Sequence, residues 1–254
     1  MRLAVMQPYF FPYIGYFQLM AAADRFLLYD NLNFIRRGWV HRNRIRLKGR
    51  EAIYCSVPLV GASSHVKIRD LQVNAEQDWQ RKLLDLLAFN YKRAPFFSEV
   101  YALVERVVRQ PATHLSGLNQ NGIRAVSEYL GIMTPIHCDM APFQRFENEA
   151  AMGRSAWMER LQQELQVEDI KTLRVLHICR HEKADTYINP PGGQALYSKE
   201  PFARNGVTLQ FIQPRLTPYP QQGESFLPAL SILDMLMHCG GDGTRQQLSD
   251  FTLL

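Results

Sequence analysis

The sequence predicts an α/β fold: a mostly parallel sheet flanked by helices, with a helical insertion in the middle of the chain. Short apolar runs alternate with longer helical patterns in the first and last thirds, as in parallel βαβ units. Between them, residues 76–131 are mostly of helical periodicity. The 254 residues, 46% hydrophobic and 21% charged, are typical of a globular protein and exclude a disordered or disulfide-stapled chain.

The first third begins with strand, loop, helix and strand. Leu3 to Met6 is a short apolar run, and residues 26–30 form a second one. Pro8 and Pro12 exclude a regular helix across the loop, whereas residues 14–23 fit one. Further strands are predicted at 53–57 and 66–73.

The rest of the chain alternates helices with short strands. Helices are predicted at 76–90, 97–109, 113–130, 154–166, 170–184, 194–205 and 226–238, and strands at 132–138, 185–188 and 207–212. Gly131 and Gly206 supply stop signals for the helices before them. Because no linker rich in Gly, Ser or Pro divides the chain, we expect a single domain over residues 1–254 with its helical insertion at about 76–131.

Composition and cysteine spacing indicate the cellular compartment of the protein and the state of its thiols. No apolar run approaches the roughly 20 residues that cross a bilayer, and no signal peptide is recognisable, so we expect a cytoplasmic protein without membrane insertion. The four cysteines, Cys55, Cys138, Cys179 and Cys239, form no CxxC pair. We therefore expect reduced thiols, mostly in the core, and no metal site. No cofactor is indicated, and the oligomeric state stays open.

A basic row lies between Arg36 and Arg50, where no carboxylate occurs. Arg42, Arg44 and Arg46 alternate and would share one face of a strand. Guanidinium groups suit phosphate or carboxylate recognition, although a solvated basic hairpin would have the same pattern. The net charge of +5 is too modest to indicate nucleic acid as the main partner. A small phosphorylated molecule, such as a nucleotide sugar or an acyl donor, is the partner we expect.

Ligands of parallel α/β sheets bind beyond the carboxyl ends of the strands. The loop after the first strand is rich in aromatic residues, which suit flat bases and sugars but would also suit the core. Its candidate binding residues are Gln7, Tyr13, Gly15 and Tyr16. Gly15, at a helix start, would let an anion approach free backbone N–H groups.

Three other segments supply candidates. Tyr187, Asn189, Gly192 and Gly193 follow a later strand, and their turn could expose amides to a phosphate. A buried carboxylate needs a partner, so Asp234, within an apolar stretch, is expected to pair with an arginine or a hydroxyl. His41 and Asp30 are the candidate catalytic proton acceptors.

Four motifs together resemble the WbqC-like protein family. They are QPYFFPYIGYFQLM at residues 7–20, RNRI at 42–45, the segment 187–193, and SILDMLMHCG at 231–240. The resemblance covers essentially the whole chain and implies a role in bacterial surface-polysaccharide (O-antigen) synthesis. Arg42, Asn43 and Arg44 of the RNRI motif are further candidate substrate-binding residues.

A fainter similarity concerns the opening alone. The order of a strand, an aromatic-Pro loop, a helix and a strand resembles the start of nucleotidyltransferases and pantothenate synthetases. Where those proteins carry a HIGH-type motif, this chain has Tyr13-Ile14-Gly15-Tyr16. The resemblance implies a Rossmann-like fold. Both histidines of that motif are replaced by tyrosines, which counts against adenylyl transfer.

Three functions fit these observations. The first is a transferase that modifies a nucleotide- or carrier-linked sugar, for example by acyl or aminoacyl transfer to an amino sugar. In that hypothesis Arg42 and Arg44 hold a diphosphate, and Gln7, Tyr13 and Tyr16 line the base or sugar pocket. The others are a non-catalytic binding module and a nucleotidyl- or glycosyltransferase.

Overall fold

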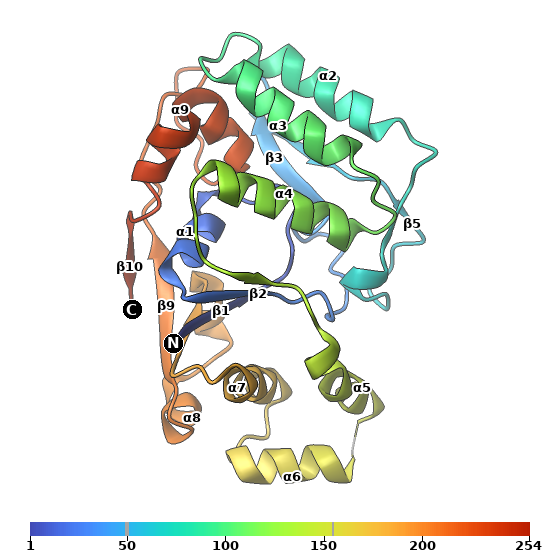
Figure 1. Cartoon of the computed structure of the whole chain (residues 1–254), viewed down its shortest axis with the longest axis vertical. Coiled ribbons are helices and arrows are strands. Elements are labelled where there is room, and N and C mark those ends of the chain that lie inside the picture. Colours follow the sequence, from blue (N-terminus) through green and yellow to red (C-terminus); the bar gives the residue numbers. More distant parts are fainter. Residues whose placement is uncertain (49–50, 154) are drawn as a thin grey trace.

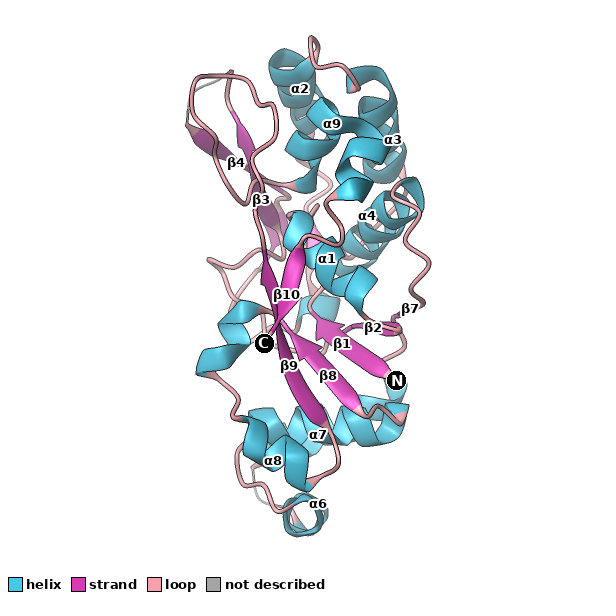
Figure 2. Cartoon of the chain, turned by 90° about the vertical axis from the view of Figure 1, so that its left-hand side faces the viewer, coloured by secondary structure: helices cyan, strands magenta, loops and turns pink. Residues whose placement is uncertain are grey.

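The structure is a computed structural model that describes residues 1–48, 51–153 and 155–254. Arg50, the end of the predicted basic row, and Arg154, the predicted start of a helix, lie outside these residues. Six strands of the described chain form one sheet in the order β10-β9-β8-β1-β2-β7 (Figure 2). Their bounds are β1 Arg2–Met6, β2 Arg25–Leu28, β7 Ile136–His137, β8 Thr186–Asn189, β9 Thr208–Pro214 and β10 Phe251–Leu253. Neighbours are parallel except β10, which is antiparallel to β9, so the predicted mostly parallel α/β sheet is confirmed.

The alternation of side chains along the strands gives the sheet two apolar faces. Leu3 of β1 and Leu27 of β2 pack in a cluster with helices α5 to α8. Their neighbours Ala4 and Phe26 point to the opposite face and pack with α1 and α4. Figure 1 shows α1 above and α7 below the strands. The bounds are α1 Ile14–Ala22, α4 Leu115–Tyr129, α5 Gln144–Met152, α6 Ala156–Leu165, α7 Ile170–Glu182 and α8 Lys199–Arg204.

A helical layer covers the upper part of the molecule in Figure 1 and confirms the predicted helical segment in the middle of the chain. It is formed by α2 Trp79–Tyr91, α3 Phe97–Arg109 and α4, joined by α9 Ile232–Gln246. These helices and the antiparallel ribbon of β3 Arg42–Arg46 and β4 Ala52–Ser56 share a third core cluster. A second short ribbon pairs β5 Leu59–Val60 with β6 Gln72–Val73.

The predicted strand over residues 66–73 is wrong for most of its length. Residues Ile68–Asp70 form a 3-10 turn, and only the last two residues pair as β6. The two buried side chains, Ile68 and Leu71, are three residues apart. That spacing matches one turn of a 3-10 helix and not the period of a strand.

Two of the predicted helices differ clearly in extent from the helices that the structure shows. In place of the helix predicted over 194–205, the structure has the end of a 3-10 turn at Pro191–Ala195 and then the short helix α8. The last helix begins at Ile232, because the Ser231 side chain caps it by accepting from Leu233 N, and it continues to Gln246. Gly240 kinks it with φ 65°, a conformation open to glycine, so the chain bends there instead of stopping. Helix α5 and strand β10 were not predicted.

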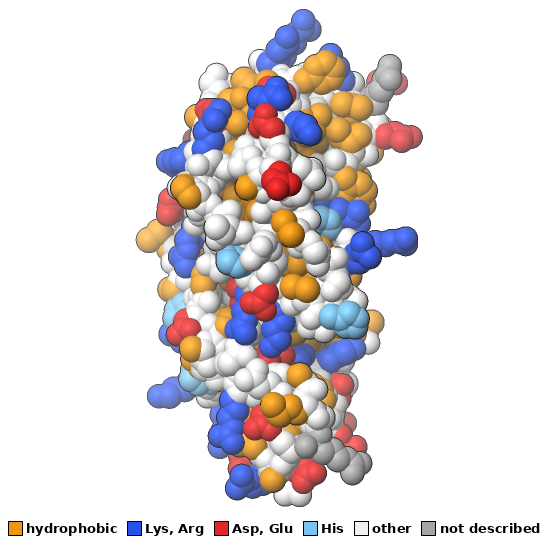
Figure 3. Space-filling model, turned by 90° about the vertical axis from the view of Figure 1, so that its right-hand side faces the viewer, with side chains coloured by type: hydrophobic (Ala, Val, Ile, Leu, Met, Phe, Trp, Pro, Cys, Tyr) orange, Lys and Arg blue, Asp and Glu red, His pale blue; other side chains and the backbone are white. Residues whose placement is uncertain are grey.

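Cys55 and Cys179 are buried, whereas Cys138 and Cys239 are half-buried, and all are free thiols. Lys and Arg side chains are spread over the whole length of the face in Figure 3, interspersed with acidic ones. A search of the described residues finds no helix with the length and apolarity that a membrane span requires.

Candidate functional site

The order of strands reverses between β1 and β8, which are neighbours in the middle of the sheet. From β1 the chain continues through α1 to β2 on one side, and from β8 through α8 to β9 on the other. Loops therefore diverge beyond the carboxyl ends of these two strands, Met6 and Asn189, and leave a crevice there.

A cavity of about 650 Å³ occupies this switch point, and we call it the switch-point cavity. The loop after β1, the loop after β8 and helix α7 provide most of its walls. Eight residues predicted from the sequence line it: Gln7, Tyr13, Gly15, Tyr16, Tyr187, Asn189, Gly192 and Gly193. The tertiary structure thus brings two predicted segments, more than 170 positions apart in the chain, to one cavity.

Close backbone packing explains two glycines of the cavity wall. A Cβ at Gly15 would lie 2.5 Å from the Tyr13 ring, so that ring can rest on the start of α1. A Cβ at Gly193 would lie 1.9 Å from Asn189 Oδ1. Asn189 in turn donates through Nδ2 to the Tyr187 hydroxyl at 2.5 Å. By contrast, a Cβ at Gly192 would meet open space.

The turn after β8 has few amides to offer an anion. Pro190 and Pro191 have no N–H, and the Gly193 N–H donates to the carbonyl of Pro190 at 2.9 Å. Gly192 is the position of the predicted turn at which an amide could face a phosphate.

The tyrosines differ in what they can do. Tyr16 is 1% exposed, and its hydroxyl donates to the Gln7 carbonyl at 2.9 Å, so it holds the loop together. Burial raises its pKa well above the ordinary value, and the neighbouring Tyr9 and Cys138 add to this shift. Tyr9 and Tyr13 are half-buried on the cavity wall, where their rings can contact a ligand.

Arg174 of α7 also lines the cavity, and sequence reasoning missed it. Its Nε donates to Glu147 Oε1 at 2.5 Å and its Nη2 to Oε2 at 3.2 Å. The Tyr29 hydroxyl donates to the same Oε1 at 2.6 Å, and burial together with the Glu147 charge raises the Tyr29 pKa. The sequence does carry a signal for Arg174. It stands between the apolar residues Leu173 and Val175, and a cation in apolar surroundings needs a partner.

The candidate catalytic residues lie outside the lining of this cavity. Asp30 follows β2 and is 6% exposed; Ser116 donates to its carboxylate at 2.5 Å. Burial raises the pKa of Asp30 in spite of that hydrogen bond. His41 packs edge-on against Phe34, and its pKa is lowered by burial and by the Arg42 charge.

The basic row is held on the β3–β4 ribbon by aromatic contacts. The Arg42 guanidinium lies 4.4 Å from the centre of the Tyr54 ring, and that of Arg44 lies 5.7 Å from the Trp39 ring. Arg42 donates to the carbonyls of Arg37 and Gly38. Arg46, expected on the same face, is 3% exposed and donates to Ser225 O at 2.5 Å. These arginines do not line the switch-point cavity.

Residues of two other motifs do not line the cavity but donate hydrogen bonds to the loop after β1, which does. Asn43 donates through Nδ2 to the carbonyls of Phe10 and Phe11, at 3.2 and 2.7 Å. Ser231 donates through Oγ to the same Phe11 carbonyl at 2.7 Å. Phe11 has φ 39°, in the left-handed region, so these two donors hold an unfavourable turn in place.

Asp234 is fully buried in α9, away from the switch-point cavity. Two tyrosine hydroxyls, and not an arginine, donate to it: Tyr91 to Oδ2 at 2.6 Å and Tyr219 to Oδ1 at 2.8 Å. Within the described ranges, no group of three or more His, Cys, Asp or Glu side chains is arranged to hold a metal ion.

Fold and site define an α/β protein with a mostly parallel sheet and a ligand-sized cavity at its switch point. A comparison with family models matches residues 7–246 to the WbqC-like protein family, and the chain belongs to this family. It is similar to "Uncharacterized protein Rv1507c" of Mycobacterium tuberculosis, with 28% identity over 244 residues that make up 95% of each chain. No solved structure is significantly similar to the chain.

Proposed function

We propose that the protein is a transferase that acts on a nucleotide- or carrier-linked sugar in bacterial surface-polysaccharide synthesis. Acyl or aminoacyl transfer to an amino sugar is the reaction type we favour. The observation that carries this proposal is the switch-point cavity, because two motifs of the family, residues 7–20 and 187–193, provide much of its lining.

The lining suits a phosphorylated sugar in size and chemistry. Its volume of about 650 Å³ lies within the usual range for small-molecule sites. Tyr9 and Tyr13 offer ring faces for a base or a sugar, and the Gln7 and Asn189 amides offer hydrogen bonds. Arg174, whose Nε and Nη2 bind Glu147, adds its remaining guanidinium N–H groups for a phosphate oxygen.

A non-catalytic binding module is the second candidate, and one observation favours it. Neither Asp30 nor His41, the two expected proton acceptors, lines the switch-point cavity. A protein that only holds the sugar intermediate for a partner enzyme needs no such group.

Ligand binding tests both candidates, with Gly192→Leu as the blocking variant. Its side chain would extend from a position on the cavity wall with open space around it. Thermal shift is measured with nucleotides, nucleotide sugars and acyl-CoA thioesters; a ligand at 100 times its Kd adds about 2.7 kcal/mol of stability. We expect a shift in the wild type that Gly192→Leu abolishes. Gly117→Leu, in open space on α4, is the control and should keep it.

Two outcomes would contradict the proposals. If no ligand of these classes shifts the wild type, or if Gly192→Leu shifts as much as the wild type, the cavity is not the binding site. Where binding is present, incubation of the bound sugar with acyl or aminoacyl donors separates the candidates. A covalently modified sugar supports the transferase, and binding without product supports the binding module.

A further inference from the structure

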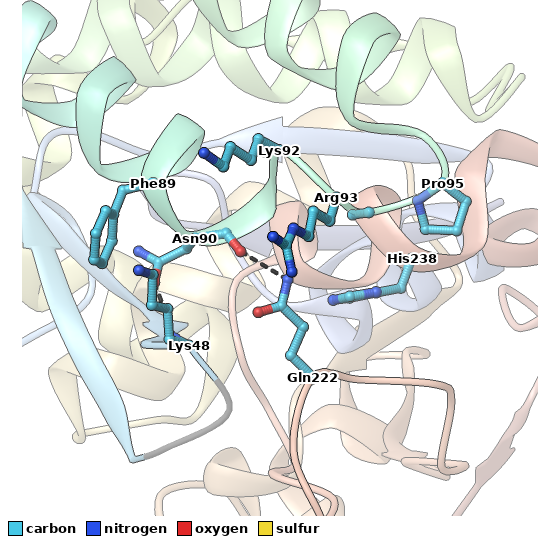
Figure 4. Close-up of a pocket in the computed structure, with 9 residues that line it drawn as sticks. Lys48, Phe89, Asn90, Lys92, Arg93, Pro95, Gln222 and His238 are labelled. Atoms are coloured by element: carbon cyan, nitrogen blue, oxygen red, sulfur yellow. Dashed lines mark hydrogen bonds between the residues drawn. The ribbon is translucent and has the colours of Figure 1, made fainter.

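A second cavity, of about 520 Å³, lies in the upper part of the molecule, and we call it the α2 cavity. Lys48 just after β3, the carboxyl end of α2 with the residues that follow it, the segment before α9, and α9 itself enclose it (Figure 4). Its lining residues are Lys48, Phe89, Asn90, Lys92, Arg93, Ala94, Pro95, Gln222 and His238. None of these described residues lines the switch-point cavity.

Three cations surround the α2 cavity, and its described lining has no carboxylate. They are Lys48, Lys92 and Arg93, and none of them forms an ion pair in the part of the chain that the structure describes. Lys92 and Arg93 follow the carboxyl end of α2, where cations stabilise the negative end of the helix dipole. The dipole does not explain Lys48, because it comes from a different segment of the chain. Like charges around a concave surface attract an anion, since it relieves their repulsion.

Polar groups of the wall are arranged around the same space. Figure 4 shows Gln222 between Arg93, Asn90 and His238, and its Nε2 donates to the Asn90 carbonyl at 2.7 Å. Lys48 lies with Nζ 3.5 Å from the centre of the Phe89 ring. The Phe89 ring thus holds Lys48 at the rim of the cavity.

His238 provides an independent observation at the back of the cavity. Its Nε2 is buried and has no hydrogen-bond partner among the described residues. The imidazole stands edge-on to Tyr91, whose hydroxyl is committed to Asp234, and the other oxygen of Asp234 accepts from Tyr219. Buried polar atoms usually have a hydrogen-bond partner, and a group bound in the α2 cavity would supply one to His238 Nε2.

We propose that the α2 cavity binds a phosphate-bearing small molecule of the diphosphate class. The diphosphate lies among Lys48, Lys92 and Arg93, and one of its oxygens reaches His238. Lysine and arginine are the usual partners of phosphate oxygens, and the charge-assisted bonds are about twice as strong as neutral ones. The inference is independent of the proposed function, because it concerns another cavity.

Inorganic pyrophosphate is the probe, and isothermal titration calorimetry measures its Kd on the full chain. Arg93→Gln and Lys48→Gln each remove one cation from the rim, and both side chains are exposed, so folding should be unaffected. Lys82→Gln is the matched control: Lys82 is exposed on the same helix α2 but outside the lining. His238→Phe removes the orphan nitrogen while keeping a ring in place.

We expect the wild type to bind pyrophosphate, and Arg93→Gln and Lys48→Gln each to raise the Kd about tenfold. His238→Phe should also raise it, whereas Lys82→Gln and the blocking variant Gly192→Leu should not. A diphosphate can belong to a soluble nucleotide or to a lipid carrier, so ADP and phosphatidylcholine vesicles with an isoprenoid diphosphate are titrated in separate arms. Absence of pyrophosphate binding would overturn the inference. An equal loss in Lys82→Gln would overturn it too, because it would show attraction by net charge alone.

Discussion

Asn43 and Ser231, 188 positions apart in the chain, donate hydrogen bonds to one backbone carbonyl, that of Phe11. Asn43 belongs to strand β3 and Ser231 caps helix α9. The carbonyl they share lies in the loop from which Gln7, Tyr9 and Tyr13 line the switch-point cavity. Two motifs that do not reach the cavity therefore support one that does.

This arrangement predicts that Ser231→Ala costs more than an ordinary helix cap. Loss of the cap alone should cost about 1 kcal/mol, and loss of the bond to Phe11 about 1 kcal/mol more. Ser155 of α6 is a matched control, because its side chain caps by accepting from Met158 N and does not contact this loop. Urea denaturation of Ser231→Ala and Ser155→Ala measures the difference, and equal losses would contradict a role in holding the loop.

Asn43→Ala combined with Ser231→Ala tests whether the two donors act on one carbonyl. Residues that share a hydrogen-bond partner show coupling of about 0.5 to 3 kcal/mol in a double-mutant cycle. We therefore expect the double variant to differ from the sum of the single variants by this amount. Strict additivity would show that the two bonds are energetically separate.

Arg174 and Arg180 lie on the same helix α7 but in different surroundings, which makes them a matched pair. The Arg174 and Glu147 side chains are 19% and 7% exposed, whereas Arg180 and Glu164 are 62% and 57% exposed. Arg174→Ala leaves the Glu147 carboxylate buried without its cation and should cost about 3 to 5 kcal/mol.

Arg180→Ala should cost about 0 to 1 kcal/mol, because the exposed pair is screened by solvent. Chemical denaturation measures both variants. Adding Glu147→Gln to Arg174→Ala removes the stranded charge and should restore part of the stability. Similar losses in Arg174→Ala and Arg180→Ala would show that burial does not matter for the first pair.

Asp30 should give the fold a distinct pH dependence. Burial raises its pKa in the folded state above the unfolded value, despite the hydrogen bond from Ser116. The folded state then holds the proton more tightly, so this contribution to stability is present below the unfolded pKa and is lost as the pH rises through the folded pKa.

Asp30→Asn has no proton to lose and should lack this decline. The free energy of unfolding is measured from about pH 3 to pH 7, across the range of carboxyl titration. Asp242→Asn, at a side chain that is 91% exposed, is the control and should follow the wild-type curve. A wild-type decline that persists unchanged in Asp30→Asn would assign the effect to another group.

Gly240 and Gly117 should respond to alanine in opposite directions. At Gly240 the backbone has φ 65°, and a Cβ would lie 2.6 Å from the Phe96 ring, so Gly240→Ala should destabilise by about 1 to 3 kcal/mol. Gly117 lies inside α4 with nothing near a Cβ, and Gly117→Ala should stabilise by about 0.5 to 1 kcal/mol. The melting temperatures of the two variants measure this, and a shift of the same sign in both would contradict the geometry.

The sequence alone determined the α/β class, the position of most helices and the loops at the carboxyl ends of β1 and β8. Those features depend on local signals: apolar periodicity, the prolines of the opening loop, and glycines after helices. Two-residue strands such as β5 lack such signals, because pairing with another segment forms them. At Gly240 the local signal for a helix end is present, but the chain bends against Phe96 and α9 continues to Gln246.

Only the tertiary structure decided which candidate residues meet. It separated the arginines of β3 from the switch-point cavity and stacked Arg42 and Arg44 on aromatic rings instead. It brought Arg174 of α7 to the cavity and gave Asp234 two tyrosine hydroxyls as partners. The physical reason is that ion pairing, stacking and burial depend on distances between segments far apart in the chain, which no local pattern of residues encodes.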